Sequence, residues 1–476
     1  MATYIGLDLG TSSLKAILID EDETVLAEHT VPLSVQRPHD GWSEQDPASW
    51  AAAADAALAA LVGKADCSAL AGIGLSGHMH GATLLDADDR VLRPCMLWND
   101  TRSAAQAARM DADPRYRAIT GNIVFPGFTA PKVEWVRETE PAVFEKIAKI
   151  LLPKDYLRLH LTGDHVAEMS DAAGTAWFDT GVRDWSDALL ADCQLSRAQM
   201  PSLVEGSAIS GRLRDGFGLP SVPVAGGAGD NAAAAIGAGV VQDGTAFLSL
   251  GTSGVLFAAN DGYRPDPATA VHTFCHAVPG TWHQMGVILA ATDALEWLAR
   301  LTGQTAAGLT RELGPLQAPG RTLFLPYLGG ERTPHNNAAI RGQFLHLDHA
   351  TDAKAATRAV LEGVAYAFAD SRDALAATGT TIRQALAIGG GAKSAYWLEV
   401  LATVLGFSLD VPRAGDFGAA LGAARLGRMA ATGAGAEIAT TPPIERAVTP
   451  DAGLTAAFTE GHARYRDSYQ ALKGLH

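Results

Sequence analysis

Residues 5–15 read Ile-Gly-Leu-Asp-Leu-Gly-Thr-Ser-Ser-Leu-Lys. The first five of them form a short apolar strand that carries one carboxylate, Asp8. Gly10 has no Cβ, so the backbone can turn tightly after this strand. Residues 16–19 are apolar again, and two such runs around a glycine-containing turn indicate a β-hairpin.

The residues of this turn suit a phosphate group. Thr11, Ser12 and Ser13 offer hydroxyl and backbone N–H donors, and Lys15 adds a positive charge. Successive backbone N–H groups in a turn form an anion-binding concavity, and a carboxylate such as Asp8 can hold magnesium through water. The turn therefore predicts phosphate and magnesium binding. The alternative is an ordinary turn beside a solvated aspartate, because short glycine-rich motifs also occur by chance.

The same pattern occurs again near the middle of the chain. Residues 248–254 read Leu-Ser-Leu-Gly-Thr-Ser-Gly, follow an apolar segment and open another at residues 255–258. A single repeat of this kind predicts two similar domains that face each other. Gly251 and Thr252 lie in the second turn, but Ser249 replaces the aspartate. The two turns are therefore expected to have unequal roles across one cleft.

Length and charge restrict the class of protein. The chain has 476 residues, 47% of them hydrophobic, which allows two or three domains with sizeable cores. Its formal net charge of −15 opposes nucleic-acid binding, which needs a basic face. No apolar run approaches the roughly 20 residues of a membrane span, and no signal-peptide pattern opens the sequence. We expect a cytoplasmic protein without a nucleic-acid or membrane partner, and a homodimer is compatible with these features.

The cysteines point to a reducing compartment. They are scattered and form no C-x-x-C pair, which favours buried free thiols over a disulfide framework or a zinc site. His272 and His276 flank Cys275 with a metal-like spacing. We interpret this segment as a strand, in which such side chains alternate across the sheet. The cysteines are Cys67, Cys95, Cys193 and Cys275.

The first domain is predicted to span residues 1–240. Asp46 and Pro47 suit the N-cap and first turn of the Ala-rich helix at 48–62. The next buried strand, 70–75, leads into Ser-Gly-His-Met-His-Gly at 76–81. Ligands bind at the carboxyl ends of strands in open α/β sheets, so this loop is predicted to contact substrate. The alternative is loop histidines satisfied by backbone; a metal pair is not favoured, because no third ligand lies nearby.

A second candidate substrate segment and an insertion follow. Residues 97–102 read Leu-Trp-Asn-Asp-Thr-Arg, and Trp98 beside these polar side chains suits a polyol. The alternative is a helix N-cap at Asn99 or Asp100 with the tryptophan in the core. From about 100 to 215 the alternation of strands and helices breaks down, which indicates an insertion that builds a binding wall.

The end of the first domain carries the candidate catalytic residue. Residues 222–231 form a strand that runs into small residues and then Asp230-Asn231, followed by an Ala-rich helix. The small residues allow a ligand to approach the backbone, and Asp230 could act as a base at the mouth of the cleft. The alternative is a helix N-cap, because a negative charge is favourable at a helix N-terminus.

The second domain is predicted to span residues 241–476. Its loop at 324–335 is long and rich in turn formers and charge, which is typical of functional loops. The strand at 385–388 ends in three glycines, and Gly390 and Gly391 would let an adenine or ribose lie against the backbone, with a bare tight turn as the alternative. Residues 416–423 are expected to start a tightly packed helix, and the tail from about 430 to form a polar helix and linker.

Four of these segments together resemble the FGGY carbohydrate kinases, a branch of the actin-like ATPase superfamily. Each segment alone is a weak signal, but their order is specific, and the resemblance covers nearly the whole chain. The segments are Asp8–Ser12, Gly227–Asn231, Leu250–Gly254 and Gly389–Ala392.

The resemblance implies an α/β fold with two actin-like (ribonuclease H-like) ATPase domains that flank a central cleft. The sugar would bind the first domain, and ATP with magnesium would lie between the domains. Asp230 would be the catalytic base, and Asp8 would help to place the metal. The sugar would contact Met79, His80, Trp98, Asp230 and Asn231, and the nucleotide Thr11, Ser12, Ser13, Lys15, Gly251, Thr252, Gly390 and Gly391.

Within the family, the chain looks closest to bacterial kinases of D-xylulose, which implies phosphorylation of that sugar by ATP. Glycerol-using relatives carry Arg-Glu where this chain has Met79-His80. Lys15 replaces the arginine of some relatives, so its phosphate contact would be a point charge. Ribulose, gluconate or a related polyol remains an alternative acceptor. A non-catalytic ATPase or regulator is less expected, because the first turn leaves no room ahead of it for a DNA-binding segment. The resembling segments are 78–81, 97–100, 152–159 and 330–337.

Overall fold

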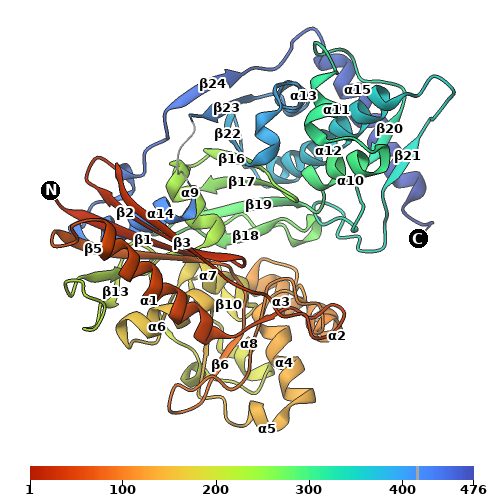
Figure 1. Cartoon of the computed structure of the whole chain (residues 1–476). Helices are drawn as coiled ribbons and strands as arrows, with labels where there is room; N and C mark the ends of the chain where they lie inside the picture. Colours follow the sequence, from red (N-terminus) through yellow and green to blue (C-terminus); the bar gives the residue numbers. More distant parts are fainter. Residues whose placement is uncertain (414–417, 476) are drawn as a thin grey trace.

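The computed structural model describes residues 1–413 and 418–475. Two seven-stranded sheets, each packed against helices, form two lobes (Figure 1). This arrangement confirms the α/β class and the two-lobed architecture expected from the repeated turn. Within these two ranges, no helix is long and apolar enough to cross a bilayer.

The first sheet is built around the first hairpin. β1 pairs antiparallel with β2 and parallel with β5, and the full order is β13-β14-β5-β1-β2-β3, with β15 beside β5. Its core residues on β1, such as Leu7 and Leu9, are fully buried. The strands are β1 (Thr3–Leu9), β2 (Ser13–Asp20), β3 (Val25–Pro32), β5 (Leu70–Gly77), β13 (Ile209–Arg212), β14 (Pro223–Ala225) and β15 (Ala228–Gly229).

The second sheet repeats the central pairing of the first. Its order is β18-β19-β17-β16-β22-β23-β24, and β16 pairs antiparallel with β17 and parallel with β22. The two glycine turns therefore occupy equivalent places in the two sheets, which confirms the predicted structural repeat. The strands are β16 (Ala246–Leu250), β17 (Gly254–Asn260), β18 (His272–Cys275), β19 (Trp282–Ile288), β22 (Gln384–Ile388), β23 (Ser408–Pro412) and β24 (Ile444–Val448).

Helices cover both sheets. α1 (Pro47–Lys64) begins as predicted, because the Asp46 side chain accepts a hydrogen bond from the N–H of Ala48 at 3.0 Å. The helices between β5 and β13 form a layer below the first sheet in the view of Figure 1, and α7 (Met169–Ala172) of this layer also contacts β18 of the second lobe. The remaining helices outside α14 are α2 (Ala104–Asp111), α3 (Pro114–Thr120), α4 (Thr129–Thr139), α5 (Pro141–Phe144), α6 (Pro153–Thr162), α7 (Met169–Ala172), α8 (Asp187–Asp192), α9 (Asp230–Ala238), α10 (Thr292–Thr302), α11 (Ala306–Arg311), α12 (Ala353–Ala377), α13 (Ala395–Leu405) and α15 (Thr455–Leu472).

One late helix, α14 (Ala419–Thr432), returns to the first sheet and packs on β1 and β5. The approach is so close that a Cβ on Gly74 would lie 1.8 Å from the carbonyl oxygen of Ala423. Arg425 on this helix donates to both carboxylate oxygens of Glu23, at 2.7 and 2.6 Å. Because α14 lies between β23 and β24 of the second sheet in the chain but packs on the first sheet, it links the two lobes in addition to the direct connection between α9 and β16. The first residues of the predicted helix, 416 and 417, lie outside the described residues.

The tail contains the predicted polar helix, α15, but it also includes a strand that was not predicted. This strand, β24, pairs antiparallel with β23 at the edge of the second sheet. Its three central residues, 445–447, are exposed, so the strand has no apolar alternation that the sequence could reveal. The prediction for the cysteines is confirmed, since all four are buried free thiols.

Candidate active site

Strand register brings together two aspartates that are far apart in the sequence. Asp8 on β1 lies opposite Ser76 on β5, and Ala228 on β15 lies opposite the same serine on its other side. Asp230 follows β15 directly and begins α9. Ser76 donates a hydrogen bond from Oγ to Asp8 Oδ1 at 2.9 Å. Both carboxylates are therefore at the same end of the first sheet.

Asp230 is the first residue of α9, and Gly229 occupies the N-cap position, so the N-cap interpretation is wrong. Its Oδ1 accepts hydrogen bonds from the backbone N–H of Asn231 at 2.7 Å and from its side-chain Nδ2 at 2.9 Å. Burial, followed by the negative charge of Asp8, raises the pKa of Asp230 to about 6. A carboxylate with a pKa near neutrality is suited to accept a proton from a substrate.

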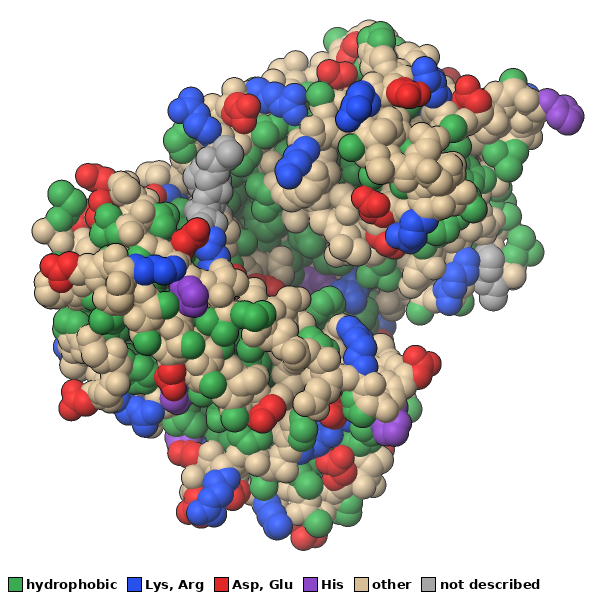
Figure 2. Space-filling model, viewed as in Figure 1, with side chains coloured by type: hydrophobic (Ala, Val, Ile, Leu, Met, Phe, Trp, Pro, Cys, Tyr) green, Lys and Arg blue, Asp and Glu red, His purple; other side chains and the backbone are tan. Residues whose placement is uncertain are grey.

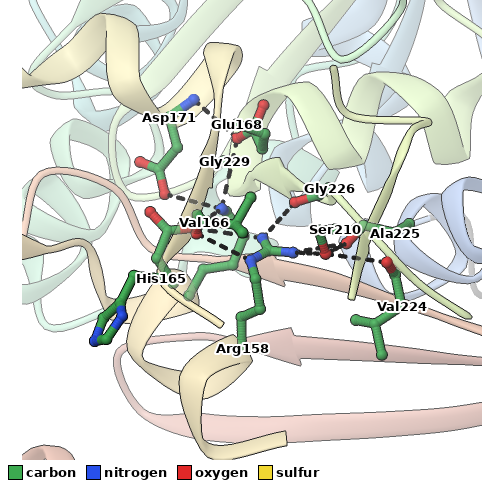
Figure 3. Close-up of polar contacts among 12 residues, drawn as sticks. Arg158, His165, Val166, Glu168, Asp171, Ser210, Val224, Ala225, Gly226 and Gly229 are labelled. Atoms are coloured by element: carbon green, nitrogen blue, oxygen red, sulfur yellow. Dashed lines mark hydrogen bonds and ion pairs between the residues drawn. The ribbon is translucent and has the colours of Figure 1, made fainter. Parts of the chain in front are cut away.

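A buried polar cluster holds the segment that leads into α9 (Figure 3). Arg158 donates to the carbonyl oxygens of residues 225–226 at 2.8 and 2.5 Å. The N–H of Gly229 donates to Ser170 Oγ at 3.1 Å, and this hydroxyl donates to Glu168 Oε1 at 2.9 Å. Both ends of the segment are therefore fixed by side chains from the helical layer, which positions the first turn of α9.

The first glycine turn lies beside Asp8. The N–H of Gly10 donates to the carbonyl of Ser13 at 2.9 Å and closes the turn, and Ser12 is exposed. Lys15 lies opposite Asp8 in the hairpin. Burial raises the pKa of Asp8, and the hydrogen bond from Ser76 and the charge of Lys15 offset part of this rise. The ammonium group also lies 3.3 Å from a Glu28 carboxylate oxygen.

The second glycine turn adjoins the triple glycine. The carbonyl of Gly251 accepts hydrogen bonds from the N–H of Thr292 at 2.9 Å and from its Oγ1 at 2.8 Å, while Thr252 is exposed. A Cβ on Gly391 would lie 2.9 Å from Leu250 Cβ, so the glycine allows the two turns to pack. A cavity of about 730 Å³ lies beside this junction, and Gly390 continues the same turn as the first residue of a short 3₁₀ helix. Lining residues include Gly389, Ala392, Lys393, Val411 and Arg446.

A second cavity, of about 290 Å³, is shared by the two lobes. Figure 2 shows the molecule hollowed between the lobes, with histidine and cationic side chains on the floor of the hollow. The first lobe contributes all five predicted sugar contacts, and the second lobe closes the opposite wall. The first-lobe lining includes Met79, His80, Trp98, Phe125, Phe128, Asp230 and Asn231, and the second-lobe lining includes Ser253, His272, Phe274, Met285 and Arg332.

His80 is held in one orientation and one tautomer. Its backbone has a φ of +70°, which is uncommon for a residue with a Cβ. Its Nδ1 lies 2.9 Å from the carbonyl oxygen of Gly174, so Nδ1 carries the proton and Nε2 is an acceptor. A Cβ at position 174 would lie 2.2 Å from His80 Cε1, which requires glycine there. Burial and then the charge of Lys132 lower the pKa of His80 to about 3, so the ring is neutral.

Other predicted residues have different surroundings. Trp98 is 49% exposed, so the core interpretation is wrong, and its Nε1 donates to Thr11 Oγ1 at 3.1 Å. Asp100 is fully buried and accepts hydrogen bonds from Arg102 and from the N–H of Ser43, which makes it structural. His78 is buried against Trp50 and does not line the shared cavity. Among the described residues, no cluster of three His, Cys, Asp or Glu side chains could hold a metal.

The contribution of the second lobe to this cavity was not predicted from the sequence. Phe274 and His272 lie on β18, and Arg332 lies in the loop after β20 (Leu323–Leu325). Phe125 and Phe128, from the helical layer, were also missed. The composition of the loop at 324–335 indicates a functional loop, but no local signal in its sequence reveals which cavity it reaches.

Comparisons with known proteins agree with this architecture. The model of the FGGY family of carbohydrate kinases matches with its N-terminal domain at residues 3–237 and its C-terminal domain at residues 246–431. A xylulose kinase of Escherichia coli is 48% identical, and the match covers 99% of each chain. A xylulose kinase of Bacillus subtilis is 38% identical, over 90% of this chain and 88% of the relative.

Solved structures are similar over the whole length. A crystal structure of a kinase from Brucella ovis has a TM-score of 0.98 and 57% identity, with 100% of both chains covered. A xylulose kinase from Rhodospirillum rubrum has a TM-score of 0.93 and 30% identity, with 99% of both chains covered. These similarities confirm the expected fold, in which two actin-like domains flank the shared cavity.

Proposed function

The chain belongs to the FGGY family of carbohydrate kinases, and we propose that it transfers the γ-phosphoryl group of ATP to D-xylulose. The product would be D-xylulose 5-phosphate. The names of the similar enzymes support this acceptor. We assign sugar binding to residues 1–240 and nucleotide binding to residues 241–476, in keeping with the two family-model matches.

The observation that carries the proposal is the position of Asp230, which begins α9, is held by Asn231 and lines the cavity shared by both lobes; burial raises its pKa to about 6, which suits this role. In the proposed reaction, its carboxylate accepts the proton of the terminal sugar hydroxyl while that oxygen bonds to the γ-phosphorus. The bond from this phosphorus to the bridging oxygen breaks, and ADP leaves with that oxygen. Phosphoryl transfer depends on positioning and charge neutralisation more than on covalent catalysis.

The phosphates of ATP would be held between the two glycine turns. Thr11, Ser12 and Ser13 would donate from the first turn, and Gly251 and Thr252 from the second. Gly390 and Gly391 would face the adenosine, next to the cavity of about 730 Å³.

The residues present also fit magnesium. Asp8 and Asp230 are neighbouring carboxylates, since the charge of Asp8 raises the pKa of Asp230, and a cation would relieve this repulsion. Magnesium usually takes one or two carboxylates and completes its shell with water and phosphate oxygens, which suits a site without a three-ligand protein cluster among the described residues. When bound through Asp8, the ion would neutralise charge on the phosphates.

The sugar would lie in the cavity of about 290 Å³. The Nε2 of His80 offers an acceptor to a sugar hydroxyl, Asn231 offers an amide, and Met79 and Trp98 offer apolar surface. Asn231 also orients the Asp230 carboxylate through its two hydrogen bonds, at 2.7 and 2.9 Å.

The test is ADP release over a panel of ketoses, aldonates and polyols, measured with the wild type and Asp230→Asn. We expect D-xylulose to give the highest kcat/KM. The variant should lose at least about 100-fold in kcat, the lower end of what a positioned base supplies, and should still bind the sugar. Preference for another acceptor would refute the substrate, and near-normal turnover of the variant would refute the base.

A further inference from the structure

Arg332 belongs to the second lobe but faces the first lobe across the shared cavity. It lies in the loop that follows β20, and its side chain lines the cavity together with Phe125 of the helical layer. The guanidinium carbon lies 4.6 Å from the centre of the Phe125 ring. Its Nη1 lies 3.3 Å from Nε2 of His272 on β18. The group is therefore placed between the two lobes.

The loop that carries Arg332 is fixed to β19. The N–H of Thr333 donates to the carbonyl of Val287 at 3.0 Å, and the N–H of Val287 donates to Thr333 Oγ1 at 3.0 Å. Glu331 Oε1 accepts from the N–H groups of Leu289 and Arg332 at 3.0 and 2.8 Å. The position of the guanidinium is therefore determined by the second sheet, which is a requirement for a residue that selects a substrate.

The guanidinium of Arg332 has N–H donors that are available to a ligand in the cavity. Within the described residues, no carboxylate forms an ion pair with it, because the neighbouring Glu331 is directed to backbone N–H groups. Burial raises the pKa of Glu331 to about 8, which weakens its charge further. His272 supplies one acceptor, Nε2, and an arginine has five N–H donors in a planar fork. The side chain is partly exposed where it lines the cavity.

Ring contacts connect Arg332 to His80 along one wall of the cavity. His272, which contacts the guanidinium, has its ring 6.0 Å from that of Phe128, and the Phe128 ring lies 4.7 Å from the His80 ring. Asp230 lines the same cavity. A sugar whose terminal hydroxyl meets Asp230 would extend its other end, with the ketone and the neighbouring hydroxyl, toward the wall that carries Arg332.

We propose that Arg332 is a specificity-determining residue that donates hydrogen bonds to the oxygen atoms at the ketone end of the acceptor. A planar fork suits two neighbouring acceptor oxygens. His80 would bind the same sugar from the first lobe, so the acceptor would connect the lobes. The inference rests on the proposed function, and it predicts that Arg332 discriminates a ketose, with its planar carbonyl, from the pentitol, in which a tetrahedral hydroxyl group replaces that carbonyl.

The test compares Arg332→Met with the wild type, using D-xylulose, xylitol and ATP as varied substrates. The matched control is Arg321→Met, an exposed arginine of the same lobe that lies 3.7 Å from Asp348. We expect Arg332→Met to raise the KM for D-xylulose at least about tenfold, the usual effect of losing a charge-assisted hydrogen bond. Its preference for D-xylulose over xylitol in kcat/KM should fall about tenfold, with the KM for ATP within about twofold. The control should match the wild type.

Two results in Arg332→Met would overturn the inference, and one result in the wild type would refute the proposed function instead. An unchanged sugar KM and unchanged preference in Arg332→Met would overturn the inference while leaving the proposed function intact. Equal losses for ATP and for both acceptors would mean a structural role and would also overturn it. If the methionine variant does not fold, Arg332→Lys provides the same comparison, with a several-fold loss of preference expected because the fork is lost. A wild type without D-xylulose-dependent ADP release would instead refute the proposed function.

Discussion

The pKa of Asp230, about 6, predicts how activity depends on pH. The residue can act as a base only when it is deprotonated. With this pKa, about nine tenths of the molecules carry the carboxylate at pH 7 and about one tenth at pH 5. The kcat/KM for the sugar should therefore fall about tenfold between pH 7 and pH 5, with a slope that approaches one proton.

Asn231→Ala should shift this fall in activity to higher pH, because it should raise the pKa of Asp230. The substitution removes the Nδ2 donor, 2.9 Å from Asp230 Oδ1, and keeps the backbone N–H at 2.7 Å. Loss of a hydrogen bond to the charged form raises a pKa, here by about one unit for one charge-assisted bond. In the variant, activity relative to its own plateau should be about fivefold lower than that of the wild type at pH 6. At pH 8 the relative activities should be nearly equal.

The assay is ADP quantified after quenching between pH 5 and pH 9, with magnesium and ATP well below saturation, so that the profile reports the enzyme before a cation neutralises Asp8. Quenching avoids the pH dependence of coupling enzymes, and circular dichroism at each pH checks that the protein stays folded. A wild-type profile that is flat from pH 7 to pH 5 would refute the assignment of Asp230 as a base with a raised pKa. If the activity of Asn231→Ala falls at the same pH as that of the wild type, or at a lower pH, the role given to the side-chain hydrogen bond is refuted.

Two further substitutions probe the surroundings of Asp230, the proposed base. Asp8→Asn should raise the magnesium concentration needed for half-maximal activity by at least about tenfold, because a ligand charge is lost; an unchanged magnesium titration would contradict the metal role. Ser170→Ala removes the acceptor of the Gly229 N–H at 3.1 Å. It should lower kcat several-fold by loosening the start of α9 and lower the melting temperature by a few degrees; a lower melting temperature with unchanged kcat would mean that the contact serves stability alone.

Much of the fold could be predicted because its signals are local. The hairpin at residues 5–19, the helix that starts at Pro47 and the strand before the triple glycine all follow from apolar runs, turn residues and caps within a few positions. The exposed edge strand β24 was missed, because its central residues lack an apolar pattern. The exposure of Trp98 was left open, since composition alone does not separate stacking on a ligand from packing in a core.

The sequence by itself determined the two glycine turns, the strand that carries Asp8 and the helix that Asp230 begins, because each depends on the preferences of neighbouring residues. Only the tertiary structure decided which of these elements meet. Asp8 and Asp230 lie close together because both flank β5 in a common register. Arg332 reaches the shared cavity because its loop is hydrogen-bonded to β19. Contacts between residues hundreds of positions apart depend on how sheets and lobes pack, and no short stretch of sequence encodes that packing.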